Sequence, residues 1–138
     1  MPAVKDAVTL LGSKDAVATV AVKDLERAKK FYEGTLGLKP TGPDAMDEEV
    51  RVYRTGNSKL MVYRSQYAGT NQATSATWGL GKDLEAFVEA LRAKGVSFEH
   101  YDSMPGTTLK GDVHVFGDFK AAWFKDPDGN ILHVNSGS

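Results

Sequence analysis

Three histidines and no cysteine are the side chains of this 138-residue chain best suited to metal binding or proton transfer. His133 lies in an apolar segment near the end of the chain, and His114 lies in a glycine-rich stretch. His100 alternates with Asp102. Imidazole titrates near neutral pH and binds transition metals, so these residues could act as general acids or bases or as metal ligands. The absence of cysteine excludes disulfide frameworks and cysteine-ligated zinc or iron–sulfur sites.

Each histidine has two interpretations. His133 is either a functional group at the bottom of a pocket or a partly buried strand residue that bonds to a neighbour. His100, Asp102 and His114 are either a metal site or solvated loop residues, and their spacing does not match a helical His-x-x-x-His pair. The sequence contains no Ser-His-Asp order, nucleophile elbow, phosphate loop or dinucleotide fingerprint, so covalent hydrolases and nucleotide-dependent enzymes lack support.

Composition further narrows the classes of protein to which the chain could belong. Lys and Arg total 17 against 18 for Asp and Glu, which gives a net charge of -1 and removes the electrostatic footprint of a nucleic-acid-binding protein. No uninterrupted apolar segment would serve as a signal sequence or cross a membrane, so we expect a cytoplasmic protein. A chain of this length is expected to form one domain over residues 1–138.

The elements that must position these residues come in two copies. The tetrapeptide Lys-Asp-Leu-Glu begins at Lys23 and again at Lys82, and each copy precedes a helical pattern that ends at a glycine. Asp24 and Asp83 are predicted to cap the two helices by accepting bonds from free backbone N–H groups. The repeated charges therefore predict helix starts rather than a recognition motif.

Strand-like runs surround both helical patterns, and the turn Asp126-Pro-Asp-Gly129 predicts a hairpin between the last two. The sequence therefore predicts an α+β fold of two β-α-β-β-β half-domains, about 15–64 and 76–135, joined by a linker over 65–75. The irregular stretch 104–118 could form a flap over a cavity. Residues 1–15 have helical spacing but fit a mobile leader equally well.

Two longer motifs, VAVKDLERAKKFYEGTLGL near the start and AWFKDPDGNIL near the end, resemble those of the vicinal oxygen chelate superfamily. This group includes glyoxalase I, extradiol dioxygenases, fosfomycin resistance enzymes and bleomycin-binding proteins. The resemblance covers residues 15–135 and implies a curved sheet that forms a cup, and it also implies a homodimer. Members typically hold one divalent metal in the cup with His or Glu ligands from the first and last strands of each half.

The resemblance places those four ligand positions at Val17, Met61, Ala76 and His133. Three of the four side chains cannot bind a hard divalent ion, and one neutral imidazole would hold it weakly. The chain is therefore similar to a metal-free branch of the superfamily, in which the cup survives as a pocket and no cofactor is expected.

Several side chains are expected on the face of the cup, with Arg51 or Arg54 available for a carboxylate or phosphate. The expected apolar and aromatic lining residues are Tyr53, Met61, Tyr63, Trp78 and Trp123, with His133 beside them. The leading hypothesis is a protein that binds a small, partly hydrophobic molecule without a metal. A cationic drug such as bleomycin fits poorly, because the chain has no acidic excess.

Two alternatives stay open. One is a glyoxalase-like lyase or isomerase that uses a displaced divalent metal or His133 as acid or base. The other is a protein that retains the fold mainly for dimerisation.

Overall fold

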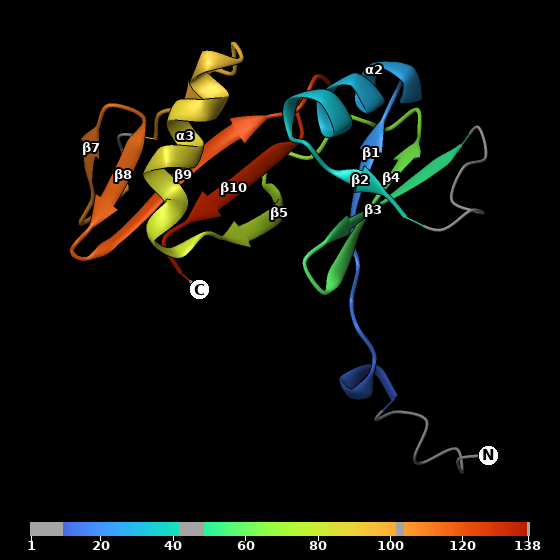
Figure 1. Cartoon of the computed structure of the whole chain (residues 1–138), viewed down its shortest axis with the longest axis horizontal. Coiled ribbons are helices and arrows are strands. Elements are labelled where there is room, and N and C mark those ends of the chain that lie inside the picture. Colours follow the sequence, from blue (N-terminus) through green and yellow to red (C-terminus); the bar gives the residue numbers. More distant parts are fainter. Residues whose placement is uncertain (1–9, 42–48, 102–103, 138) are drawn as a thin grey trace.

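The computed structural model describes residues 10–41, 49–101 and 104–137, which form two β-sheets side by side with both helices on the same side (Figure 1). The first half contains η1 (Leu10–Ser13), β1 (Ala18–Val22), α2 (Leu25–Lys29), η2 (Lys30–Thr35), β2 (Lys39–Pro40), β3 (Val50–Thr55) and β4 (Ser58–Arg64). The second half contains β5 (Thr74–Gly79), η3 (Gly81–Asp83), α3 (Leu84–Ala93), β6 (Phe98–Glu99), β7 (Thr108–Lys110), β8 (Val113–Phe116), β9 (Phe119–Lys125) and β10 (Ile131–Asn135). No helix in these ranges has the length and apolar character needed to cross a membrane.

The two sheets share one plan. The first has the order β1-β4-β3-β2, with β1 parallel to β4, and the second has the order β5-β10-β9-β8-β7, with β5 parallel to β10. The remaining pairs are antiparallel, and β6 extends the same edge of β9 that β8 occupies. The first half therefore follows the β-α-β-β-β order, and the second half follows it with the strands β7 and β8 inserted between β6 and β9. The predicted α+β fold of two such modules is confirmed.

Alternation along the strands decides which side chains face the helices. In β1 the side chains of Val20 and Val22 are buried against the helical layer, and in β10 those of Leu132 and Val134 are. The residues between them, such as Thr19 and His133, face the opposite side because successive strand residues point to opposite faces. The faces away from the helices are the ones on which a cup would form.

The two copies of the Lys-Asp-Leu-Glu tetrapeptide precede helices that begin in different ways. Asp24 caps α2 as predicted: its carboxylate accepts hydrogen bonds from the backbone N–H groups of Glu26 (3.0 Å) and Arg27 (3.3 Å). The predicted cap at Asp83 is wrong, because Asp83 is the last residue of the 3₁₀ turn η3 and its side chain makes no capping bond. The second helix enters through that turn instead.

The irregular stretch 104–118, which could form a flap, contains a regular hairpin. Within it β7 and β8 pair with each other, and β8 pairs with β9, so residues 108–116 extend the second sheet. The strand that follows α3 is short, with only Phe98 and Glu99 in β6. Residues 1–9 lie outside the described ranges, and η1 has no buried residue.

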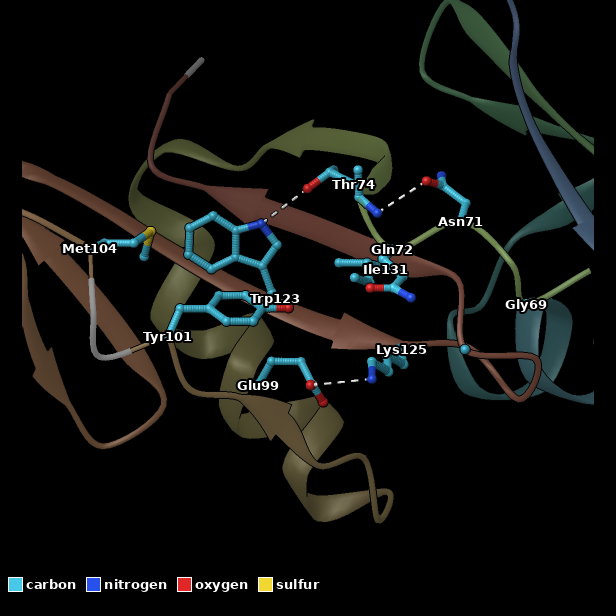
Figure 2. A pocket seen from close by; sticks show the side chains of 12 residues that line it. Gly69, Asn71, Gln72, Thr74, Glu99, Tyr101, Met104, Trp123, Lys125 and Ile131 are labelled. Carbon is cyan, nitrogen blue, oxygen red and sulfur yellow. Dashed lines mark hydrogen bonds and ion pairs between the residues drawn. The ribbon is translucent and has the colours of Figure 1, made fainter.

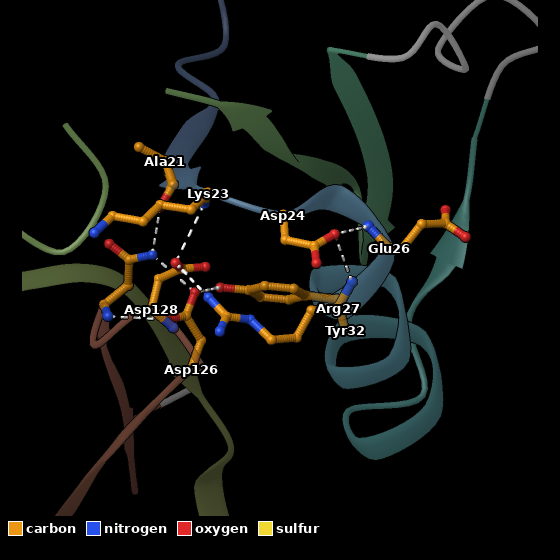
Figure 3. A network of polar contacts seen from close by, with 9 residues as sticks. Ala21, Lys23, Asp24, Glu26, Arg27, Tyr32, Asp126 and Asp128 are labelled. Carbon is orange, nitrogen blue, oxygen red and sulfur yellow. Dashed lines mark hydrogen bonds and ion pairs between the residues drawn. The ribbon is translucent and has the colours of Figure 1, made fainter. Parts of the chain in front are cut away.

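A polar network joins the two halves at the predicted turn between β9 and β10 (Figure 3). The Asp126 carboxylate, which is buried, accepts a hydrogen bond from the Tyr32 hydroxyl at 2.7 Å. The Asn130 amide donates to the carbonyl oxygen of Ala21 (2.7 Å), and Arg27 pairs with Asp128 (2.7 Å). The turn therefore connects strands of one half and also fixes that half to β1 and α2 of the other.

Candidate functional site

A cavity of about 680 Å³ opens on the face of the second sheet that is turned away from α3 (Figure 2). Its floor comes from β9 and β10, one wall comes from the linker that precedes β5, and the other wall comes from β6 and the residues after it. The lining residues are Gly69, Asn71, Gln72, Ala73, Thr74, Glu99, Tyr101, Met104, Trp123, Lys125, Gly129 and Ile131. Aromatic and apolar side chains with a few polar groups are the usual lining of a small-molecule site.

Trp123 is the central aromatic side chain of this face. Because Trp123 and His133 are directly opposite each other on β9 and β10, their rings stack with centroids 4.4 Å apart and 25° between the planes. The rings of Tyr101 and His114 pack edge to face against the indole, with their centroids 5.3 and 5.1 Å from the indole centroid, respectively. The indole Nε1 donates to the Thr74 hydroxyl at 3.3 Å, which ties the floor to the linker side of the cavity.

Both ring nitrogens of His133 have hydrogen-bond partners. Nδ1 lies 3.1 Å from the carbonyl oxygen of Ala122, which can only accept, so Nδ1 carries the proton. Nε2 lies 3.2 Å from the Asn135 amide nitrogen, whose orientation is set because the Asn135 oxygen accepts from the Gly137 backbone N–H. Burial lowers the pKa of His133 because it disfavours the charged imidazolium. In this arrangement His133 is a neutral stacking partner of Trp123.

The other two histidines do not form a shared metal site. The His100 Nε2 pairs with Asp112 at 2.7 Å near the surface. His114 is fully buried, and its Nε2 accepts a hydrogen bond from the backbone N–H of Tyr101 at 2.9 Å. Burial also lowers the pKa of His114. Asp102 lies outside the described residues, and among those that are described no three His, Asp or Glu side chains are arranged to hold a metal ion.

The positions that the resemblance implied for metal ligands do not fit a divalent ion. Val17 precedes β1 and is 38% exposed, and Met61 offers only a thioether. The placement of Ala76 at a ligand position is wrong, because Ala76 pairs with Leu132 and is buried on the helix side. Its neighbour Thr77 is opposite His133 on the cup side. None of these side chains has the donor chemistry that would complete a site around His133.

The structure brings only part of the predicted lining together. Trp123 lines the cavity and His133 stacks on it, whereas Met61, Tyr63 and Arg54 lie on the equivalent face of the first sheet and are not among the residues that line the cavity. For Tyr53 and Trp78 the predicted face is wrong.

Tyr53 is fully buried beneath η2, where its hydroxyl and the Arg51 guanidinium both donate to the Glu33 carboxylate, at 2.9 and 2.8 Å. Trp78 lies on the helix side of β5, on the same face as the buried Ala76 two residues before it. There Trp78 lines a smaller apolar cavity of about 120 Å³, with Leu36, Leu38, Leu80, Phe87, Phe124 and Val134.

Sequence reasoning missed the linker wall and the pair of charged residues in the cavity. The linker runs close to the β9–β10 turn: a Cβ on Gly69 would lie 2.7 Å from the carbonyl oxygen of Asp128. Glu99 and Lys125 form an ion pair inside the cavity, with Glu99 Oε1 3.6 Å from Lys125 Nζ. The alternation of Glu99 with Tyr101 was the available signal, since residues two apart on an extended strand share a face.

The doubled β-α-β-β-β unit with a cavity on its open face defines a class of α+β proteins built from paired modules. The chain belongs to the glyoxalase/bleomycin resistance protein/dioxygenase superfamily, whose family model matches residues 15–134. A search of curated protein sequences finds no match.

Several solved structures share the fold. Lactoylglutathione lyase from Agrobacterium tumefaciens superposes with a TM-score of 0.64 at 16% identity, covering 89% of this chain and 92% of that one. The fosfomycin resistance protein FosX from Mesorhizobium loti superposes with a TM-score of 0.62 at 12% identity, covering 91% of this chain and 92% of that one. An integron cassette protein from the Halifax Harbour sewage outfall metagenome superposes with a TM-score of 0.63 at 19% identity, covering 87% of this chain and 95% of that one. At these identities the likeness establishes the fold alone.

Proposed function

We propose that this chain binds a small, partly hydrophobic molecule in the cavity above Trp123 and that it does so without a metal ion. The observation that carries the proposal is the stacking of His133 on Trp123, with both imidazole nitrogens engaged, beside a cavity of about 680 Å³. A flat or apolar group would find aromatic surface on the cavity floor, and the linker and β6 sides would supply polar contacts.

The same geometry favours binding over proton transfer by His133. A general base needs a free lone pair within reach of the substrate proton, and the lone pair of His133 on Nε2 faces the Asn135 amide. His133 is not among the residues that line the cavity, whereas the Trp123 ring stacked on it is. The protein would therefore act by sequestering or sensing its ligand. The cytoplasmic location expected from the sequence stays a prediction.

The experiment uses the two tryptophans of the chain as reporters. The probe is 2-naphthol, a flat neutral molecule, and its binding is followed through the two indole N–H signals in nitrogen-15 NMR spectra. We expect the Trp123 signal to shift and Trp123→Ala to weaken binding about tenfold, the loss expected for an aromatic contact worth roughly 1.4 kcal/mol. Trp78→Phe is the matched control, and it should bind as tightly as the unmodified chain.

Two results would overturn the proposal. One is a shift of the Trp78 signal alone, which would place the probe in the smaller cavity on the helix side. The other is a stoichiometric divalent metal that survives dialysis of the purified protein, because such a metal would require a ligand set that the described residues do not provide.

We also propose that the protein is a homodimer in which a second copy covers the open face of the first sheet. Met61 and Tyr63 lie on that face, and Tyr63 is 37% exposed. Covering such apolar side chains is the common reason for symmetric pairing.

A further inference from the structure

The ion pair in the cavity lining has a longer separation than two other ion pairs of the same half. Glu99 Oε1 and Lys125 Nζ are 3.6 Å apart, whereas Arg92 and Asp112 are 2.7 Å apart and Lys120 and Glu85 are 3.1 Å apart. A separation of 3.6 Å exceeds ordinary hydrogen-bond length, so both charged groups keep hydrogen-bonding capacity for a ligand. Both side chains belong to the cavity lining, and the other lining residues are uncharged.

The Glu99–Lys125 ion pair lies next to the apolar side chains of the cavity. Glu99 is directly opposite Trp123 across the β6–β9 pair, and Lys125 is two residues further along β9 on the same face. The charged groups therefore lie beside the aromatic floor, with Ile131 opposite Lys125 on β10 (Figure 2). A ligand that contacts the indole would have its polar end within reach of both charges.

We propose that the natural ligand class is a small zwitterion with an apolar side group, such as a free amino acid with an aromatic or branched side chain. This inference rests on the proposed function and specifies its ligand. The ligand's ammonium group would lie at Glu99, its carboxylate at Lys125, and its side group on Trp123. The charges of an α-amino acid sit on either side of one carbon atom, so they can align antiparallel to the pair and complement both members.

A ligand with one charge fits less well. A carboxylate at Lys125 also lies close to the Glu99 carboxylate and is repelled by it, and an ammonium at Glu99 is repelled by Lys125 in the same way. A neutral ligand would gain the aromatic contact but would leave both charged groups partly desolvated without new partners. The cavity therefore selects for a ligand that carries both charges.

The test compares three matched probes by isothermal titration calorimetry: L-phenylalanine, 3-phenylpropanoate and 2-phenylethylamine. The last two lack the ammonium and the carboxylate, respectively. We expect L-phenylalanine to bind about tenfold more tightly than either, since a hydrogen bond to a charged group contributes roughly a factor of ten or more. Equal binding of all three probes would overturn the proposal without any variant.

Single substitutions then separate the two contacts. Glu99→Gln should weaken L-phenylalanine and 2-phenylethylamine but not 3-phenylpropanoate, and Lys125→Gln should weaken L-phenylalanine and 3-phenylpropanoate but not 2-phenylethylamine. Glu85→Gln and Lys120→Gln are the controls, because they break an ion pair of the same half that lies outside the cavity. Losses of equal size in the controls would contradict the assignment.

Failure here can be told apart from failure of the proposed function. If 2-naphthol binds at Trp123 while the zwitterion gains nothing over its singly charged analogues, the cavity binds small molecules but does not select zwitterions. If neither 2-naphthol nor L-phenylalanine perturbs the Trp123 signal, the proposed function fails, and the ligand class fails with it.

Discussion

His133 shows how a single residue can keep its place in a fold and change its chemistry. The resemblance places it where the superfamily has a metal ligand, yet the ring stacks on Trp123 and both nitrogens bond to groups of the same sheet. A metal ligand needs a free lone pair directed into the cup, and Asn135 occupies that of His133. The interactions of the imidazole, rather than its position alone, decide its chemistry.

His114, which is fully buried, and His133, which is partly buried, make the free energy of unfolding depend on pH. Burial lowers the pKa of His133 and of His114 below the ordinary value of about 6.5. Between the lowered value and about 6.5 the unfolded chain binds more protons than the folded chain, so the free energy of unfolding falls as the pH falls through that window and is level above it. The lowered pKa of Asp112 acts at lower pH, below the ordinary carboxyl value of about 3.9.

We therefore expect urea unfolding at about pH 5.5 to give a lower free energy than at about pH 7.5. Each histidine contributes at most about 1.4 kcal/mol per pH unit, and His133 contributes less because it is only partly buried. His133→Gln should reduce the pH dependence, and Asp112 should not contribute in this range. Parallel curves for the variant and the unmodified chain would show that His133 titrates normally in the folded state.

At the scale of elements, the two copies of Lys-Asp-Leu-Glu have different local structures. Asp24 bonds to the first free N–H groups of α2, whereas Asp83 is inside η3 and bonds to none of those of α3. Asp24→Ala should therefore destabilise the chain by about 1 kcal/mol, the usual contribution of a helix cap. Asp83→Ala should change the free energy of unfolding by less than about 0.5 kcal/mol. Urea unfolding measures both, and equal losses would mean that Asp83 is also a cap in solution.

The same contrast shows what could be predicted from the sequence. Alternating apolar residues, glycine stops and the Asp126–Gly129 turn are local signals, and they predicted the two β-α-β-β-β modules correctly but not the β7–β8 hairpin inserted in the second. The register of β5 is set by its pairing with β10, which places Ala76 and Trp78 on the helix side, and the residues of β5 themselves do not indicate which set faces the helices. A shift of one residue moves every side chain of a strand to the other face, so the predicted lining was only partly correct.

Tyr53 illustrates the same limit. An aromatic residue in a strand can face the core or a pocket, and it is the contacts of Tyr53 with Glu33 and with the ring of Tyr32, both distant in sequence, that show it facing the core. The pair formed by Glu99 and Lys125 depends in turn on the pairing of β6 with β9. Contacts of this kind are set by tertiary structure, and for that reason the candidate site was harder to predict than the fold.

At the scale of the whole molecule, the two halves are fixed to each other at the β9–β10 turn, and the face of the first sheet away from the helices stays uncovered. Tyr32, Arg27 and the backbone of Ala21 bond to the β9–β10 turn, so the first half is held against the end of the cavity that Gly129 lines. The charge-assisted bonds in this network are the stronger kind, which makes a stable relative orientation. The open face of the first sheet is thereby presented in a fixed direction, as a symmetric interface requires.

The homodimer proposal predicts a mass of about twice 14.9 kDa by light scattering at micromolar concentration. Tyr63→Glu places a charge on the open face of the first sheet, where burial against a second copy would desolvate it, so this variant should elute as a monomer. Tyr67→Glu is the matched control: Tyr67 is more exposed, at 69%, and lies after β4 rather than within the sheet, so the dimer should persist. A monomer mass for the unmodified chain would refute the dimer. A dimer that survives in both variants would move the interface away from this face and leave Met61 and Tyr63 to another role.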